Sequence, residues 1–117
     1  MLKSTENQMS DILMQLDEVL ETRRSGDPTS SYVAKLHALG LDEILEKIGE
    51  ETVELIVAAK NCDSSKKRTE VVCEMADLWF HCMVLLSHLD GNVTEILDCL
   101  RERFGVSGLE EKASRSK

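Results

Sequence analysis

The sequence predicts an all-α fold, a bundle of four to five helices joined by short connections. Aromatic residues make up only 3% of the chain and there is one proline, a composition that favours helices over strands. Apolar residues recur at intervals of three and four along five stretches, each bounded by turn-forming residues. A length of 117 residues suits one domain with a core. We expect this domain at 1–106 and a polar, disordered tail at 107–117.

The first two predicted helices precede the most acidic part of the chain. Ser10 and Asp11 cap the first helix, whose apolar positions continue to Leu20 and which ends at the turn formed by residues 25–28. The second helix spans about 31–39 and stops at a glycine. Both stretches are amphipathic, so each presents one face to a core.

Three further helices complete the predicted bundle. The third covers about 42–60 and the fourth begins at 64 or 65 and ends near 89, with a polar turn between them. Residues 90–92 break the chain before a fifth helix at about 93–104. Because the turn between the third and fourth helices is short, we expect them to form an antiparallel hairpin at the centre of the bundle.

Charge and composition restrict the partners of the protein. The chain carries 22 acidic and 14 basic residues, a net charge of −8, which opposes binding to nucleic-acid phosphates. An anionic substrate would therefore need a cation between itself and the protein. The N-terminus does not resemble a signal peptide, and no run approaches about 18 apolar residues. We expect a soluble, cytoplasmic protein without a membrane partner, whose four cysteines are unpaired structural thiols.

Acidic residues of the third and fourth helices lie beside the apolar faces of those helices. Glu51 and Glu54 share one stripe of the third helix, next to a stripe that contains Ile48. Glu74 and Asp77 repeat this arrangement on the fourth helix. A solvated face is the ordinary explanation of one such pair, but two pairs that both adjoin apolar residues favour a shared site.

The two acidic pairs are matched across the expected hairpin. Glu54 and Glu74 lie ten residues on either side of Ser64, and Glu51 and Asp77 lie thirteen residues from it, so each pair should lie at one level. With helix axes about 8–10 Å apart, four carboxylates at one level repel one another unless a cation or protons neutralise them. Carboxylate ligands suit a hard divalent ion, so we expect Mg²⁺, with Mn²⁺ as a possible substitute.

The acids also carry a family resemblance. Glu50-Glu51-x-x-Glu54, then nineteen intervening residues and Glu74-x-x-Asp77, resembles the signature of the all-α nucleotide pyrophosphohydrolases. Further segments resemble the phosphoribosyl-ATP pyrophosphatase family of histidine biosynthesis over roughly residues 13–103. These segments are Ser30-Ser31-Tyr32, Lys35-Leu36 with Gly40, Lys47-Ile48-Gly49, and Ala76-Asp77-Leu78-Trp79-Phe80-His81.

The resemblance implies that water attacks the triphosphate of phosphoribosyl-ATP, giving phosphoribosyl-AMP and pyrophosphate, and that the acidic cluster holds Mg²⁺. We assign Glu51, Glu54, Glu74 and Asp77 as metal ligands, because they form two i, i+3 pairs that face each other across the hairpin. Glu50 points about 100° away from Glu51, so its carboxylate is better placed to orient a water molecule than to bind the same ion. Glu50 and Glu54 are the candidates for the general base, and the motif does not choose between them.

Two basic side chains are candidates for substrate binding. Lys47 lies one turn before Glu51, where it could contact a substrate phosphate or form a simple i, i+4 ion pair. His81 lies one turn after Asp77, where it could contact substrate, orient an acid or serve as a satisfied core histidine. The sequence leaves both alternatives open.

The fourth helix is more apolar than one small bundle requires. Residues 78–86 are apolar on almost every side except at His81. We therefore expect a homodimer or a larger homo-oligomer. The resemblance agrees, because bundles of that family associate and a second subunit can complete the site.

Three other functions fit parts of the pattern. A house-cleaning pyrophosphohydrolase of the same superfamily would use the same four acids on free nucleoside triphosphates, although the Ser-Ser-Tyr and Lys-Ile-Gly segments favour the histidine pathway. A non-enzymatic helical interaction module would use the acids only for solubility. A divalent-cation buffer or sensor lacks support, because the chain has no EF-hand loop.

Overall fold

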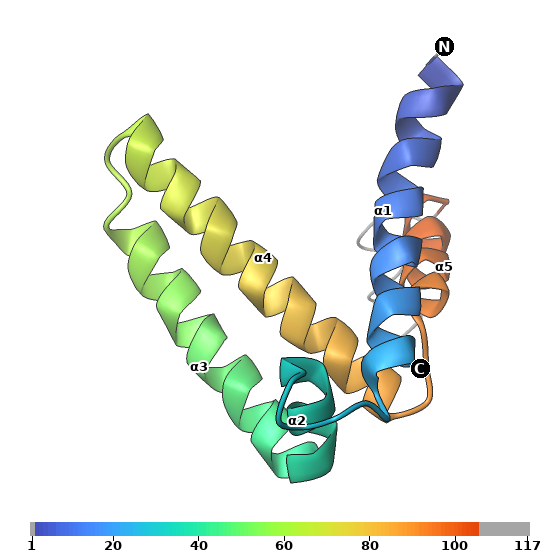
Figure 1. Ribbon diagram of the computed structural model, residues 1–117. Helices are drawn as coiled ribbons and strands as arrows, with labels where there is room; N and C mark the ends of the chain where they lie inside the picture. The colour runs from blue at the N-terminus through green and yellow to red at the C-terminus, as the bar shows by residue number, and fades with distance from the viewer. Residues whose placement is uncertain (1, 106–117) are drawn as a thin grey trace, which may run out of the picture.

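A computed structural model describes residues 2–105 and, for side chains, residues 11–105; this part of the chain contains five α-helices and no strand (Figure 1). The all-α prediction is confirmed. The expected tail at 107–117 lies outside the described residues. The helices are α1 (Leu2–Arg23), α2 (Tyr32–Leu39), α3 (Leu41–Lys60), α4 (Ser65–His88) and α5 (Val93–Phe104).

Side-chain caps fix the starts of three helices. Ser31 and Ser64 each accept a hydrogen bond from the backbone N–H three residues later, at 3.2 Å in both cases. Asn92 forms a reciprocal capping box with Glu95 at the start of α5. The predicted start of the first helix at Ser10 and Asp11 is wrong, because α1 already begins at Leu2. Residues 2–10 contain neither Pro nor Gly, so nothing in them breaks the helical backbone.

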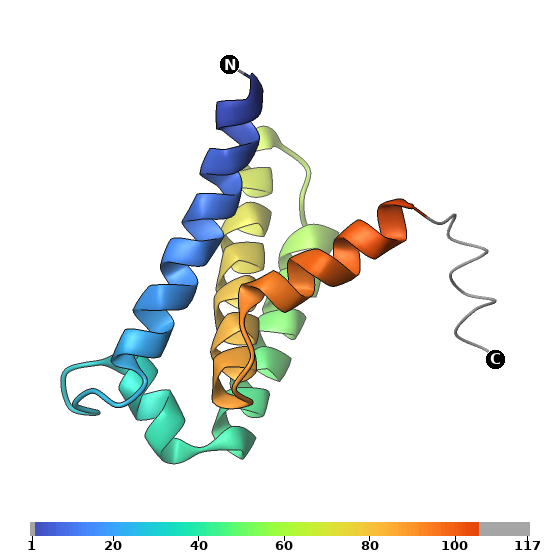
Figure 2. The same cartoon turned by 90° about the vertical axis from the view of Figure 1, so that its right-hand side faces the viewer.

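The core lies at one end of the molecule. It joins the C-terminal part of α1, α2, the first turns of α3, the last turns of α4 and the start of α5. Its largest fully buried side chains are Leu20, Leu36, Ile44 and Val84. α3 and α4 lie side by side as an antiparallel hairpin in both views (Figures 1 and 2). α1 meets α4 at the core end and diverges from it toward the hairpin turn (Figure 1). The α3–α4 half near the turn therefore projects beyond the core.

Many apolar side chains of this projecting half face solvent. Val53, Ile56 and Val72 are between 56% and 60% exposed, and Trp79, farther along α4 toward the core, is 57% exposed. The predicted apolar face of α4 is likewise only partly covered, since Met75 is 41% exposed. All four cysteines are free, and only Cys82 is partly buried; Cys62, Cys73 and Cys99 are exposed.

α4 is the one helix in the described part of the chain whose length and mean hydropathy, 1.2, would suffice to cross a membrane. Its apolar run is interrupted by Glu74, Asp77 and His81. The core helix of a soluble bundle has the same composition, so this property does not assign α4 to a membrane.

Candidate functional site

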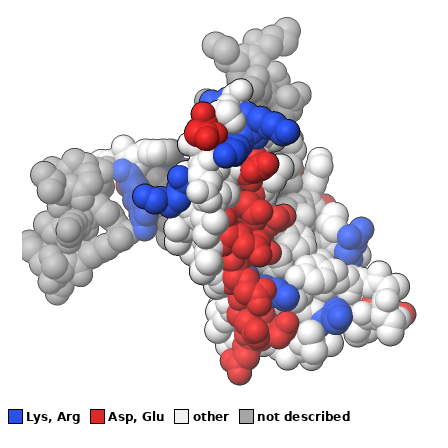
Figure 3. All heavy atoms as spheres, turned by 90° about the vertical axis from the view of Figure 1, so that its left-hand side faces the viewer, with Lys and Arg blue, Asp and Glu red and all other residues white. Residues whose placement is uncertain are grey.

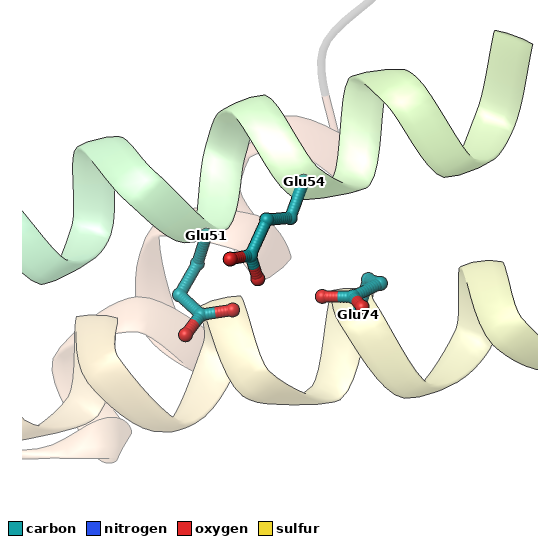
Figure 4. A group of neighbouring side chains, drawn as sticks. All are labelled: Glu51, Glu54 and Glu74. Atoms are coloured by element: carbon teal, nitrogen blue, oxygen red, sulfur yellow. The ribbon is translucent and has the colours of Figure 1, made fainter.

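Three glutamates meet between the two helices of the hairpin. Glu51 and Glu54 come from α3 and Glu74 from α4, and each offers a carboxylate oxygen within 4.8 Å of the other two (Figure 4). The spacing of three residues turns Glu51 and Glu54 toward the same side of α3, where α4 runs antiparallel. We call these residues the glutamate triad. Sequence spacing predicted that they would come together, and the structure places them so.

Two oxygens of the triad are buried without a partner. Glu51 Oε2 and Glu74 Oε2 are shielded from solvent and accept no hydrogen bond. Glu54, by contrast, is exposed. A buried, unpaired carboxylate oxygen is costly unless a proton or a cation lies against it. The triad offers only oxygen donors, so the residues present fit a hard divalent ion such as Mg²⁺ or Mn²⁺.

The environment of the triad raises carboxyl pKa values. Burial raises the pKa of Glu51 most, the charges of Glu54 and Asp77 add to the effect, and His81 opposes it. The pKa of Glu74 is raised by burial and then by the charges of Glu54, Asp77 and Glu70. The fold therefore brings like charges together, which destabilises the metal-free protein. A bound cation would remove this destabilisation.

Asp77, the fourth predicted ligand, does not belong to the triad. It is exposed on α4, and no oxygen of its side chain lies within 4.8 Å of all three glutamates. Its charge nevertheless raises the pKa of both Glu51 and Glu74, so it lies close to the site. The role of Asp77 as a metal ligand stays a prediction.

Lys47 and Glu50 pair with each other. Lys47 Nζ lies 3.4 Å from Glu50 Oε2, and this carboxylate raises the pKa of the Lys47 ammonium. The i, i+4 ion pair with Glu51 that the sequence allowed is not formed. Glu50 is exposed beside the triad rather than in it. Substrate contact by Lys47 and the general-base role of Glu50 or Glu54 stay predictions.

His81 is buried and both of its ring nitrogens have partners. The residue is 6% exposed; Nδ1 lies 2.9 Å from the backbone oxygen of Asp77, and Nε2 lies 2.8 Å from the hydroxyl of Tyr32. Nδ1 also lies 4.0 Å from Glu51 Oε1. Tyr32 has no functional role predicted from the sequence, where its only signal is its place in the Ser-Ser-Tyr segment. The hydrogen-bonded state of His81 agrees with a positioning role, and its contact with substrate stays a prediction.

The surroundings of the triad are strongly negative. Figure 3 shows acidic side chains gathered in one continuous band on the α3 side of the molecule. α3 contains six acidic residues, namely Asp42, Glu43, Glu46, Glu50, Glu51 and Glu54. A polyphosphate could approach this face only with a cation between the two sets of charges.

Comparison with known proteins agrees with the site. The family model described as phosphoribosyl-ATP pyrophosphohydrolase matches residues 13–104, which include all of the acids considered above. A curated protein from Hydrogenovibrio crunogenus, named phosphoribosyl-ATP pyrophosphatase, is 50% identical over 108 residues, or 92% of this chain and 96% of the relative. This chain therefore belongs to the phosphoribosyl-ATP pyrophosphohydrolase family.

Proposed function

We propose that this protein hydrolyses phosphoribosyl-ATP to phosphoribosyl-AMP and pyrophosphate in histidine biosynthesis, and that the reaction depends on Mg²⁺. Membership of the family supports the reaction. The glutamate triad, with two buried oxygens that lack partners, is the observation that supports the metal dependence.

Each residue of the site receives a proposed role. Glu51, Glu54 and Glu74 hold the ion between α3 and α4, and Asp77 lies close enough to join them through a modest change of its side chain. When bound, the ion supplies positive charge for the triphosphate and for the departing pyrophosphate. Glu50 or Glu54 accepts the proton of the attacking water. Lys47 lies beside these groups, where its ammonium can leave the ion pair with Glu50 and bind a substrate phosphate instead.

A house-cleaning enzyme for free nucleoside triphosphates is the second candidate, because the same acids would serve it. The relative at 50% identity favours the histidine pathway, since its name specifies phosphoribosyl-ATP. An interaction module without activity is disfavoured, because the matched family is a family of hydrolases.

We also propose that the protein acts in the cytoplasm as a homodimer or larger homo-oligomer. The projecting half of the α3–α4 hairpin leaves Val53, Ile56 and Val72 at least 56% exposed, and Trp79, farther along α4, is 57% exposed. A second copy would cover such a face. An apolar groove between α1, α4 and α5 lies next to Trp79 and continues this surface.

The test measures pyrophosphate release from phosphoribosyl-ATP and from common nucleoside triphosphates, with and without Mg²⁺. We expect turnover of phosphoribosyl-ATP only with the metal, and its loss in a Glu54→Gln, Asp77→Asn double variant. A matched control is the Glu102→Gln, Asp98→Asn variant, which removes the same charges from two exposed positions on α5.

The outcomes separate the candidate functions. Preference for a free nucleoside triphosphate would move the protein to the house-cleaning branch. Full activity in the Glu54, Asp77 double variant would contradict the assigned site. Turnover that persists after removal of every divalent ion would contradict the metal dependence alone.

A further inference from the structure

A hydrogen bond connects α2 to the metal-binding face of α4. The Tyr32 hydroxyl lies 2.8 Å from Nε2 of His81, although the two residues are 49 positions apart. The Tyr32 ring meets the His81 ring edge-on, at 86° and 5.8 Å between centroids, and stacks on Phe80 at 19° and 6.3 Å. Tyr32 is thus held in place by its ring as well as by its hydroxyl.

The partners of His81 fix its tautomer. The backbone oxygen of Asp77 can only accept a hydrogen bond, so Nδ1, at 2.9 Å from it, must carry a proton. In the neutral ring Nε2 is then the acceptor, and the Tyr32 hydroxyl donates to it. With 6% of the residue exposed, the ring has little room to turn. The Asp77 carbonyl therefore fixes the Nδ1–H form of His81, and the Tyr32 hydroxyl holds the Nε2 end of the ring in place.

This N–H edge faces one oxygen of the triad. Glu51 Oε1 lies 4.0 Å from His81 Nδ1. The other oxygen, Oε2, is buried without a partner. Oε1 of Glu51 thus faces the N–H edge of the His81 ring, while Oε2 remains available to bind the ion.

We propose that Tyr32 and His81 are positioning residues for the metal. The Tyr32 hydroxyl anchors the Nε2 end of the His81 ring, and the opposite Nδ1 edge then stays beside Glu51 Oε1, so that Oε2 stays with Glu54 and Glu74. The inference rests on the proposed metal dependence of the site. It assigns to α2, which contributes no carboxylate to the triad, a part in metal affinity.

Removal of the hydroxyl should loosen the Nε2 end of the imidazole ring, while the Asp77 carbonyl keeps Nδ1 protonated. The Nδ1 edge would then be held less firmly beside Glu51 Oε1. Groups that orient metal ligands typically change metal affinity by about 10–100-fold when removed. Tyr32→Phe should therefore weaken Mg²⁺ binding about 10-fold, at the lower end of this range, because the remaining ring keeps its packing.

The experiment measures Mg²⁺ affinity by titration calorimetry on the full chain without substrate, together with the ¹⁵N shifts of the His81 ring. Phe80→Leu is the matched control, because it disturbs the stacking of Tyr32 and leaves the hydroxyl. We expect Tyr32→Phe to weaken Mg²⁺ binding, to move the ¹⁵N shift of His81 Nε2, which loses its hydrogen bond, while Nδ1 stays protonated, and to keep the Tm of the metal-free protein. We expect Phe80→Leu to keep the affinity and the tautomer even where it lowers Tm.

Steady-state kinetics supply a second readout. The Tyr32→Phe variant should need more Mg²⁺ for half-maximal rate and should approach the wild-type kcat when Mg²⁺ is saturating. Unchanged Mg²⁺ affinity in Tyr32→Phe, with normal binding in the wild type, would overturn this inference alone. Equal losses of affinity in Tyr32→Phe and Phe80→Leu would also overturn it, since they would show a packing effect. Absence of Mg²⁺ binding by the wild type would overturn the metal site and the inference together.

Discussion

The two carboxylates of Glu51 and Glu74 are placed where burial disfavours their charge. In both residues burial is the main cause of the raised pKa, and neighbouring acids add to it. A carboxyl whose pKa is raised by folding favours folding in its protonated form and opposes it once ionised. The metal-free protein should thus lose stability as pH rises from 4.5, the ordinary value for glutamate, through the raised values.

Mg²⁺ should reverse this loss. We expect the Tm gained on adding Mg²⁺ to be large near pH 7.5 and to shrink as pH falls toward 4.5, because protons then compete with the ion for Glu51 and Glu74. Thermal unfolding with and without Mg²⁺ across this range checks the prediction. Glu51→Gln should raise the Tm of the metal-free protein and abolish the response to Mg²⁺, whereas Glu102→Gln should alter neither. An equal gain at both ends of the pH range would contradict the site.

Residue spacing was sufficient to find the triad but not its surroundings. Helical periodicity places Glu51 and Glu54 on one stripe, and the symmetry of the hairpin brings Glu74 to them. Spacing along one chain cannot reveal contacts between distant helices, and for that reason the Tyr32–His81 hydrogen bond went unpredicted. It also could not choose the partner of Lys47, because i, i+3 and i, i+4 acids are both within reach on a helix.

At the scale of helices, one arginine joins the end of α1 to the end of α4. Arg24 follows α1 directly, and its Nη1 donates to the backbone oxygen of Ser87 and to Asp90 Oδ1, each at 2.8 Å. Its Nη2 donates to the His88 oxygen at 3.4 Å. The cation therefore lies at the negative end of the α4 dipole. The sequence alone does not reveal this contact, because the approach of α4 to Arg24 depends on packing between distant helices.

Loss of this contact should destabilise the fold. Arg24→Gln should lower the free energy of unfolding by about 1–3 kcal/mol, the range for lost hydrogen bonds to a charged, partly buried donor. Arg23→Gln removes the same charge from an exposed neighbour and should change stability by less than about 0.5 kcal/mol. Urea unfolding at one protein concentration measures both. Equal effects of the two substitutions would show that only net charge matters.

A second contact between elements depends on protonation. His37 of α2 and His88 of α4 face each other with their Nδ1 atoms 2.9 Å apart, so one nitrogen must donate and the other accept. Burial, and then the nearby His88 and Arg24, lower the pKa of His37, while Glu21 opposes them. A histidine whose pKa is lowered by folding favours the folded state only while it is neutral.

Stability should accordingly fall as pH drops below 6.5, the ordinary value for histidine, through the lowered value of His37. His37→Asn removes the titrating group. The free energy of unfolding of this variant should therefore fall less steeply with decreasing pH than that of the wild type. Lys35→Asn, an exposed change on the same helix, should keep the wild-type profile. Denaturation midpoints measured between about pH 5 and pH 8 make the comparison. Parallel profiles for wild type and His37→Asn would refute the role of this pair.

Helix ends were predicted best where the chain carries strong local signals. The fifth helix was predicted within its observed bounds, and Ser31, Ser64 and Asn92 cap helices through their own side chains. The start of α1 was misplaced because a serine and an aspartate resemble a cap even inside a longer helix. Crossing angles and the divergence of α1 from α4 depend on packing between helices, which periodicity does not encode.

For the whole molecule, the uncovered apolar surface is the main feature that a single copy does not explain. We expect Trp79→Glu to convert the wild-type oligomer to a monomer, because a buried charge in the new interface would be unpaired. Leu39→Glu is the matched control: both side chains are 57% exposed, but Leu39 lies at the end of α2, away from the projecting hairpin. Light scattering coupled to gel filtration gives the masses. A monomeric wild type would contradict the proposed assembly.

The separation of the triad from the core has a consequence for motion. The buried cluster reaches Ile44 and Ile48 on α3 and Phe80 to Leu85 on α4, whereas the triad lies nearer the hairpin turn. Backbone amides around the triad should thus exchange with solvent through partial openings of the hairpin tip that leave the core intact. An ion bound by both α3 and α4 would suppress these openings. Amide protection at the hairpin tip should then increase as the metal site fills. The site is then part of what keeps its own half of the molecule folded.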